Sequence, residues 1–444
     1  MNIFFVSLGC DKNLVDSEMM ITSLRKDGFT ITDREEDAEI IVVNTCCFIG
    51  DAKEESINTL LEMASYKEDG KCRLLVAAGC LAQRYHEEIR TEIPEVDVII
   101  GTMGYEEMGT TLRDALKEKG VVESIRSIDY LPTPLTDRDN TSGGSYAYLK
   151  IAEGCDNHCA YCVIPSLRGK YRSRPLEELL DEAAELASAG VKELIVIAQD
   201  ITRYGTDLNG EHQLAKLLKE LCKLDFHWIR LHYLYPTDTT DELIDVIADE
   251  PKIVKYLDIP LQHVSKRILR AMHRPGDGAE FTRLIENMRE RIPGLVLRTS
   301  LIVGLPGETE DEFAELCEFL QNVGIERVGV FEYSPEEGTE AAELPDQIDD
   351  ETKQNRRLIV EELQSGVLDD YNTSRHGEVM QVLVEGFDDE QQLWYGRTYA
   401  DSVEVDGHVY FDAMDTEPGE GEFVSVLITE SLGPDLLGVR QKEA

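Results

Sequence analysis

Short apolar runs alternate with helical patterns over most of this chain, and this alternation limits the possible folds more than any other feature. Residues 1–130 contain four apolar runs separated by helical segments, and residues 146–372 contain six apolar runs that are separated or followed by helical segments. Alternating strands and helices favour βαβ units and parallel sheets. The sequence therefore predicts an α/β protein with two parallel-sheet regions.

The two regions differ in the number and spacing of their predicted elements. In the first region the apolar runs are residues 3–8, 38–43, 73–78 and 96–100, and the helical segments are 17–27, 51–66 and 84–93. In the second region the strand candidates are residues 146–152, 193–198, 228–232, 256–259, 295–303 and 326–333. Its main helical segments are 175–189, 212–224, 239–250, 277–291, 310–324 and 351–371. Repeated β/α units of this kind predict strands that close, fully or partly, into a barrel with its chemistry at the carboxyl ends.

Changes in composition predict the domain boundaries. Residues 131–145 are rich in Pro, Gly, Ser and Thr and have almost no apolar periodicity, which is typical of a linker. After residue 372 helical periodicity stops, and short alternating runs predict an antiparallel sheet or a small barrel. We therefore expect domains at residues 1–130, 146–372 and 373–444, with a linker at 131–145.

Three cysteines, Cys155, Cys159 and Cys162, follow the first strand of the second region within one short loop. Thiolates are soft ligands, and three of them can hold three corners of an iron–sulfur cluster while one iron stays open. A zinc site commonly needs two ligand pairs, and a ferredoxin-type cluster needs a fourth cysteine. Zinc, an electron-transfer cluster and three unrelated core cysteines remain the alternatives.

Cys10, Cys46 and Cys80 each follow an apolar run of the first region by two or three residues. The carboxyl ends of parallel strands meet at one edge of a sheet, so these thiols are predicted to converge and bind metal. Simple burial of cysteine is the alternative. Cys47 competes with Cys46, and only one of the two can ligate because neighbours on an extended chain point to opposite faces. The remaining cysteines are interpreted as core or incidental residues: Cys72, Cys222 and Cys317.

The loop spacing, with the aromatic Tyr161 before the last cysteine, resembles the signature of the radical S-adenosylmethionine (SAM) superfamily. The resemblance implies that the amine and carboxylate of SAM fill the open iron. It also implies a partial (β/α)6 barrel of the TIM type, with SAM-contacting residues on its rim. The segment 302–308 resembles the glycine motif beside the adenine, and Arg274 and Arg298 resemble positions near the SAM carboxylate. The expected SAM-binding residues are Tyr161, Gln199, Asp200, Arg274, Arg298, Gly304 and Glu308.

The segments 7–18, 44–46 and 79–80 resemble the N-terminal domain of the methylthiotransferases. This resemblance implies that Cys10, Cys46 and Cys80 carry a second iron–sulfur cluster, with Cys46 rather than Cys47 as the ligand. Asp16 also matches the family, but a helix start near Ser17 explains both residues without a function. Residues 373–444 resemble a TRAM module.

The family resemblance implies a transferase that uses SAM and two [4Fe-4S] clusters, with no catalytic side chain beyond the cluster ligands. The segments 8–16, 233–236 and 395–407 resemble the RimO branch, whose target is the β-carbon of an aspartate in the small-subunit ribosomal protein S twelve. The alternative is the MiaB branch, which modifies adenosine in tRNA. An electron donor such as flavodoxin or ferredoxin is also implied.

Charge agrees with a basic protein partner. The formal net charge is −44, and residues 374–444 contain 4 Lys or Arg against 16 Asp or Glu. Such a surface repels phosphate backbones, although a generally solvated acidic surface is the alternative explanation. The sequence has no apolar run long enough for a membrane span and no basic segment at its start, and its cysteines fit a reducing compartment. We therefore expect a cytoplasmic protein.

Overall fold

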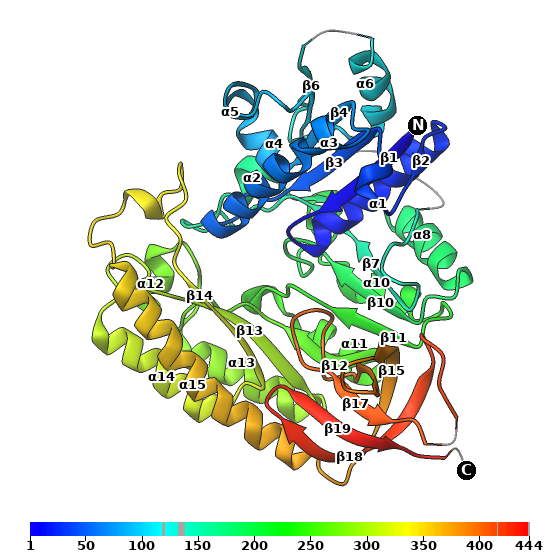
Figure 1. Ribbon diagram of the computed structural model, residues 1–444. Helices are drawn as coiled ribbons and strands as arrows, with labels where there is room; N and C mark the ends of the chain where they lie inside the picture. The colour runs from blue at the N-terminus through cyan, green and yellow to red at the C-terminus, as the bar shows by residue number, and fades with distance from the viewer. Residues whose placement is uncertain (118–119, 132–137, 415, 443–444) are drawn as a thin grey trace.

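The computed structural model describes residues 1–117, 120–131, 138–414 and 416–442. The chain forms a sheet domain at the top of Figure 1, an open barrel in the middle and a small β-barrel at the lower right. Part of the predicted linker, residues 132–137, lies outside the described residues.

The N-terminal domain is a six-stranded parallel sheet in the order β2-β1-β3-β4-β5-β6. Its strands are β1 Asn2–Ser7, β2 Thr30–Ile31, β3 Ile40–Thr45, β4 Leu74–Gly79, β5 Val98–Ile100 and β6 Val122–Ser124. Its helices are α1 Asp11–Lys26, α2 Gly50–Ala64, α3 Tyr66–Asp69, α4 Cys80–Arg84, α5 His86–Glu92 and α6 Met108–Ala115. Helices α1 and α6 pack on one face and α2, α4 and α5 on the other, which explains the continuous apolar runs of β3 and β4. The short edge strands β2 and β6 were not predicted.

Helix α1 begins at Asp11, directly after Cys10, rather than near residue 17. Asp16 and Ser17 therefore lie inside the helix, and their interpretation as helix-start residues is wrong. The start of the helix escaped prediction because Lys12, Asn13 and Asp16 are polar yet buried. An apolar periodicity cannot reveal a helix whose buried face is polar.

The central domain is an open sheet of six parallel strands in the order β7-β10-β11-β12-β13-β14, which confirms the predicted partial barrel. These strands are β7 Tyr146–Lys150, β10 Glu193–Ile197, β11 Trp228–Leu231, β12 Ile253–Asp258, β13 Val296–Val303 and β14 Arg327–Glu332, and a small hairpin adds β8 Ala152–Glu153 and β9 Arg172–Ser173. The helices are α7 Ile164–Arg168, α8 Leu176–Ser188, α9 Thr206–Asn209, α10 Leu214–Leu221, α11 Asp241–Asp249, α12 Lys266–Ala271, α13 Gly278–Arg291, α14 Glu310–Val323 and α15 Asp350–Ser374. The main apolar core lies between the sheet and the outer helices.

The inner face of the open barrel, called the lumen below, is filled from both neighbouring domains. Tyr148, Ile195 and Ile197 on the inner face pack against Val15 of α1 and against Val403 of the C-terminal domain. The N-terminal and C-terminal domains therefore both form part of the wall of the central domain's interior.

The C-terminal domain is a closed barrel of five strands in the order β15-β16-β17-β19-β18. Its strands are β15 Val379–Asp388, β16 Leu393–Arg397, β17 Val409–Asp412, β18 Phe423–Leu432 and β19 Asp435–Arg440. The pairs are antiparallel except β17 with β19, which is parallel. The domain packs beside the first residues of β11 and β13. Within the described part of the chain, every helix is too short or too polar to span a bilayer.

Candidate functional site

The loop with Cys155, Cys159 and Cys162, called the SAM-loop triad, joins β8 to α7 beside the carboxyl end of β7. Gly154 enters the loop with φ of 80°, and a Cβ on this residue would lie 2.2 Å from the carbonyl oxygen of Lys170. Only glycine combines this backbone conformation with so close an approach. Gly154 therefore fixes the course of the backbone where the chain enters the loop.

The three thiols of the SAM-loop triad lie within electrostatic reach of one another. Burial, together with the neighbouring Cys159, raises the pKa of Cys155 to about 11 and that of Cys162 to about 12. The Asn157 N–H donates to Cys155 Sγ over 3.5 Å, and Arg274 Nη1 donates to Cys159 Sγ over 3.5 Å. Such thiols lose their protons when they bind a metal.

The second group, Cys10, Cys46 and Cys80, is called the strand-end triad. Cys10 precedes α1, Cys46 follows β3, and Cys80 is the first residue of α4. Strands β1, β3 and β4 are neighbours in the sheet, so their carboxyl ends lie at one edge. A Cβ on Gly9 would lie 2.7 Å from Cys46 Cβ, which places the backbone before Cys10 against the Cys46 side chain.

The thiols of the strand-end triad also interact with one another. Burial, together with the neighbouring Cys80 and Cys10, raises the pKa of Cys46 to about 12. Burial likewise raises the pKa of Cys47 to about 12, and Cys47 packs into the apolar cluster on one face of the sheet. The structure thus brings Cys10, Cys46 and Cys80 together, with Cys47 adjacent.

The thiol arrangement suits a cluster better than a single ion. Across the residues that the structure describes, no three His, Cys, Asp or Glu side chains converge on one point as a single metal ion requires. In an iron–sulfur cluster each thiolate binds a different iron atom, so the sulfur atoms need not converge. Each set of three thiols has the donor chemistry of an iron–sulfur cluster.

Arg168 connects the two triads. Its guanidinium, 2 % exposed, donates from Nη2 to Asn13 Oδ1 at 2.6 Å and to Cys80 Sγ at 3.5 Å. Arg168 is the last residue of α7, the helix that leaves the SAM loop after Cys162. One side chain of the central domain therefore touches a thiol of the N-terminal domain.

Arg168 belongs to a buried network of two cations and two carboxylates. Arg168 Nη1 lies 2.5 Å from Asp16 Oδ2 and 3.3 Å from Glu153 Oε2, and Lys150 pairs with both carboxylates. Burial alone would raise the pKa of Glu153, but Lys150 and Arg168 outweigh it and hold the pKa at about 2. The paired charges compensate one another's desolvation. Sequence reasoning missed Lys150 and Glu153, although a charged residue that ends an apolar strand is a usable signal.

Three of the residues expected to contact SAM lie around the SAM loop. Tyr161 is partly buried; desolvation raises the pKa of its hydroxyl, and the charge of Arg274 acts to lower it. Arg274 Nη2 donates to the Pro260 carbonyl oxygen at 2.7 Å. Asp200 accepts from Asn157 Nδ2 at 2.9 Å and therefore orients the loop. Their contact with SAM stays a prediction.

The other expected residues lie further along the rim or in the lumen. Gln199 Nε2 donates to Glu153 Oε1 at 2.8 Å. The Glu308 carboxylate accepts the backbone N–H groups of Gly304 and Leu305 and closes their turn. Arg298 stands apart, because its nearest acidic neighbours are lumen residues rather than thiols of the SAM loop. Their roles in SAM binding also stay predictions.

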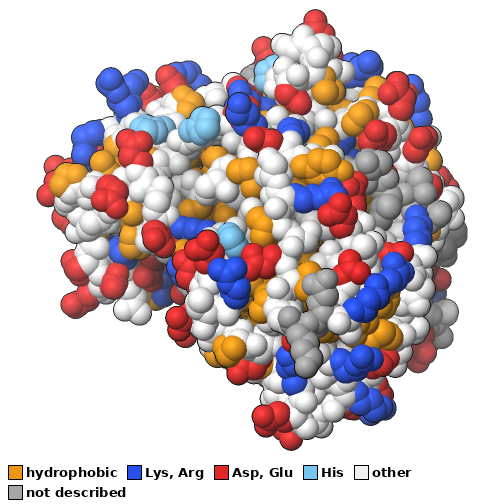
Figure 2. Space-filling model, turned by 90° about the horizontal axis from the view of Figure 1, so that it is seen from above, with side chains coloured by type: hydrophobic (Ala, Val, Ile, Leu, Met, Phe, Trp, Pro, Cys, Tyr) orange, Lys and Arg blue, Asp and Glu red, His pale blue; other side chains and the backbone are white. Residues whose placement is uncertain are grey.

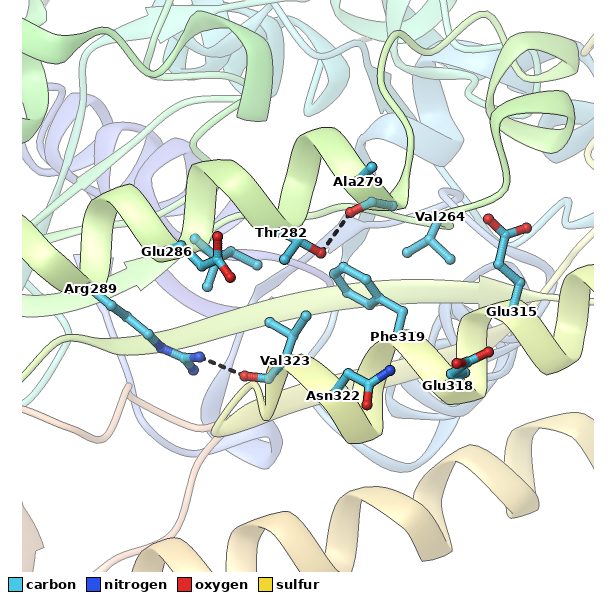
Figure 3. A pocket seen from close by; sticks show the side chains of 12 residues that line it. Val264, Ala279, Thr282, Glu286, Arg289, Glu315, Glu318, Phe319, Asn322 and Val323 are labelled. Atoms are coloured by element: carbon cyan, nitrogen blue, oxygen red, sulfur yellow. Dashed lines mark hydrogen bonds between the residues drawn. The ribbon is translucent and has the colours of Figure 1, made fainter.

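Two surface hollows lie away from both triads. A hollow of about 480 Å³ lies between α13 and α14, lined by Glu286 and Arg289 on one side and Phe319 on the other. Figure 3 shows the side chains that line it. A hollow of about 550 Å³ lies between Lys192 of the central domain and Arg440 of the C-terminal domain. Neither hollow contains a cysteine, so neither belongs to the candidate site.

Comparison with known families covers most of the chain. Residues 2–101 match the uncharacterized protein family UPF0004, residues 149–320 match the radical SAM superfamily, and residues 377–440 match the TRAM domain. The structure is similar to the radical SAM methyltransferase TsrM from Kitasatospora setae, with 14% identity, a TM-score of 0.53 and coverage of 74% of this chain and 72% of TsrM. That similarity shows the shared fold.

Two relatives extend over the whole chain. The ribosomal protein uS12 methylthiotransferase RimO of Lachnoclostridium phytofermentans is 50% identical over 99% of this chain and 100% of its own length. The RimO protein of Trichlorobacter lovleyi is 46% identical over 98% of this chain and 97% of its own length. By this full-length similarity and the three matched domains, the chain belongs to the RimO family of radical SAM methylthiotransferases.

Proposed function

We propose that this protein transfers a methylthio group to the β-carbon of an aspartate in ribosomal protein uS12. The observation that carries the proposal is the pair of cysteine triads, with Arg168 of the helix after the SAM loop donating to Cys80 across the domain boundary. The full-length similarity to RimO proteins supports uS12 as the substrate and does not favour the tRNA alternative.

The two triads fit two different chemical roles. The radical SAM family implies SAM and an iron–sulfur cluster, and we assign that cluster to Cys155, Cys159 and Cys162. We assign a second [4Fe-4S] cluster to the strand-end triad. When bound, the first cluster supplies the electron that cleaves SAM to a carbon-centred radical, and the second supplies the sulfur.

The chain's own residues shield and orient the reaction. Ile195, Ile197 and Val403 form an apolar patch on the lumen wall, which excludes water from the space beside them. Arg274, fixed by Pro260 and adjacent to Cys159, stays charged when buried and can pair with the SAM carboxylate. These residues bind and position, and acid–base chemistry is not required of them.

The protein surface supports a protein substrate rather than a nucleic acid. Figure 2 shows Lys and Arg side chains interspersed with Asp and Glu on the face seen from above, without a continuous basic field. Binding of a phosphate backbone depends on such a field. The acidic C-terminal barrel suits a basic ribosomal protein.

The proposal also covers the domain boundaries, the cellular location and the electron donor. We propose that the domains divide at residues 1–130, 146–372 and 373–444, with the linker at 131–145. A ribosomal substrate places the enzyme in the cytoplasm, where a small electron carrier such as flavodoxin or ferredoxin would reduce it.

The test supplies the anaerobically reconstituted protein with SAM, a reductant and either small ribosomal subunits or tRNA. Mass spectrometry should detect a methylthio increment on an aspartate of uS12 and none on tRNA. Modified tRNA together with unmodified uS12 would overturn the proposal.

A further inference from the structure

Two cations from different domains face the same group of lumen residues. Lys12 lies on α1, two residues after Cys10, and its side chain is 8 % exposed. Arg298 lies on β13 with its side chain 16 % exposed. A buried charge is normally paired, so each of these cations needs an acidic or anionic partner.

Lys12 reaches across the domain boundary to Tyr233, which follows β11. Its Nζ atom lies 3.0 Å from the centroid of the Tyr233 ring and 3.0 Å from Asp11 Oδ1. The Tyr233 hydroxyl donates to Asp11 Oδ1 at 3.4 Å. Tyr233 has φ of 65°, a conformation that is costly for a bulky residue and is concentrated at functional sites.

Arg298 reaches the same tyrosine through Asp258. Arg298 Nη1 donates to Asp258 Oδ1 at 3.0 Å, and the Tyr233 N–H donates to Asp258 Oδ2 at 3.2 Å. Burial raises the pKa of Asp258, and the charges of Arg298 and Lys12 both act to lower it. Tyr233 therefore lies between the two ion pairs.

Lys12 and Arg298 each have more N–H donors than their carboxylate partners use, so both can donate to a further acceptor. An ammonium group has three N–H donors and a guanidinium has five. Within the described part of the chain, Lys12 has one carboxylate within ion-pair distance, that of Asp11, and Arg298 has one, that of Asp258. The neighbouring His232 is neutral near pH 7, because burial and the nearby cations hold its pKa well below the ordinary value.

We propose that Lys12 and Arg298 form a carboxylate-binding site that takes the side chain of the substrate aspartate. The inference rests on the proposed function and specifies its substrate recognition. In aspartate the β-carbon is bonded directly to the carboxyl carbon. A carboxylate held by Lys12, two residues from Cys10, therefore brings the β-carbon to the strand-end triad. Arg298 then serves the substrate rather than the SAM carboxylate that the family resemblance implied.

The test compares two forms of uS12 that differ only at the modified aspartate. Mass spectrometry of the product identifies this residue, and the second form carries asparagine there. Affinity of the cluster-loaded protein with SAM is measured for each form by isothermal titration calorimetry. Because charge-assisted hydrogen bonds are lost with asparagine, the aspartate form should bind about tenfold more tightly or better.

Variants assign this preference to the two cations. Lys12→Met and Arg298→Gln should bring the affinity ratio of the two forms to near one, while Lys12→Arg keeps most of the preference. Lys216→Met and Arg283→Gln change exposed residues of the same two types and should leave the ratio unchanged. A thermal unfolding transition and an iron content matching the unsubstituted protein verify that each variant is folded and loaded.

Two outcomes contradict the proposals, and they are distinguishable. If uS12 is modified but both forms bind equally well, or if Lys12→Met and Arg298→Gln retain the full preference, the carboxylate site is wrong and the function stands. If uS12 is neither bound nor modified, both the function and this inference are overturned.

Discussion

The two cysteine triads are built in opposite ways. The SAM-loop triad lies within one loop, where sequence spacing alone fixes the order and approximate separation of the thiols. The strand-end triad exists only after β1, β3 and β4 have aligned side by side. The first triad is a property of a short segment, and the second is a property of a folded sheet.

Each triad has one arginine that donates to one sulfur, and the origin of this arginine differs. Arg274, beside Cys159, belongs to the same domain as its triad. Arg168, beside Cys80, comes from the neighbouring domain. The strand-end triad therefore depends on the docking of two domains as well as on the sheet.

The largest effect should follow from removing one ligand of the SAM-loop triad. Cys159→Ala leaves two thiols, which cannot retain a cluster with one open iron. We expect cleavage of SAM to 5′-deoxyadenosine to fall at least about a thousandfold, to the background level. Liquid chromatography of the reduced, SAM-treated protein measures this product. Cleavage at the normal rate would show that the loop is not the SAM site.

Cys80→Ala should separate the two triads. The strand-end cluster loses a ligand and the iron content falls to about half, while 5′-deoxyadenosine still forms. The methylthio product should disappear. Cys72→Ala is the matched control, because Cys72 is buried in the same domain but lies before β4. If Cys80→Ala still inserts sulfur at the normal rate, the strand-end triad is not the sulfur site.

Arg168→Met should weaken the docking on which the strand-end triad depends. It leaves Asp16 and Glu153 buried with Lys150 as their only cation of the network. Removing one partner of a buried ion network costs about 3–5 kcal/mol. Urea unfolding should show this loss, whereas Lys170→Gln, at an exposed position nearby, should change the free energy of unfolding by less than about 0.5 kcal/mol. Equal stability of the two variants would mean that the network contributes nothing to docking.

Much of the two parallel sheets could be predicted from the sequence because strands such as β3, β4, β10 and β11 are buried on both faces. The six strands of the open barrel appear as apolar runs, and each lies within a few residues of its predicted position. Prediction failed where elements are short or amphipathic signals are absent, as in β2, β6 and β19. The parallel pairing of β17 with β19 depends on how the small barrel closes, which no local pattern encodes.

The candidate site was predictable where chemistry depends on residue type and spacing. The cysteines were visible for this reason, and the convergence of Cys10, Cys46 and Cys80 followed from strand order. The roles of Lys12 and Arg168 were not visible, because each contacts a residue of another domain. Sequence patterns within one element do not record contacts that form only when domains dock.

The smallest effect tests whether the SAM-loop triad is as independent as its local spacing implies. His232 Nε2 lies 2.9 Å from Ser402 Oγ of the C-terminal domain, so the lumen below the SAM loop depends on that domain. The pKa of His232 is held well below its ordinary value of 6.5 by burial and by nearby Arg230. Below pH 6.5 the unfolded chain therefore takes up a proton that the folded chain does not, and the free energy of unfolding declines as the pH falls.

His232→Gln keeps a polar group near Ser402 and removes the titration. The unsubstituted protein should lose about 1.4 kcal/mol relative to this variant for each pH unit below the unfolded pKa. Urea unfolding of both proteins at about pH 7.5 and about pH 5.5 measures the difference. A difference that does not change with pH would mean that His232 is not buried as a neutral group. Ser402 of the C-terminal domain would then not enclose the imidazole of His232, and the lumen there would be open to solvent.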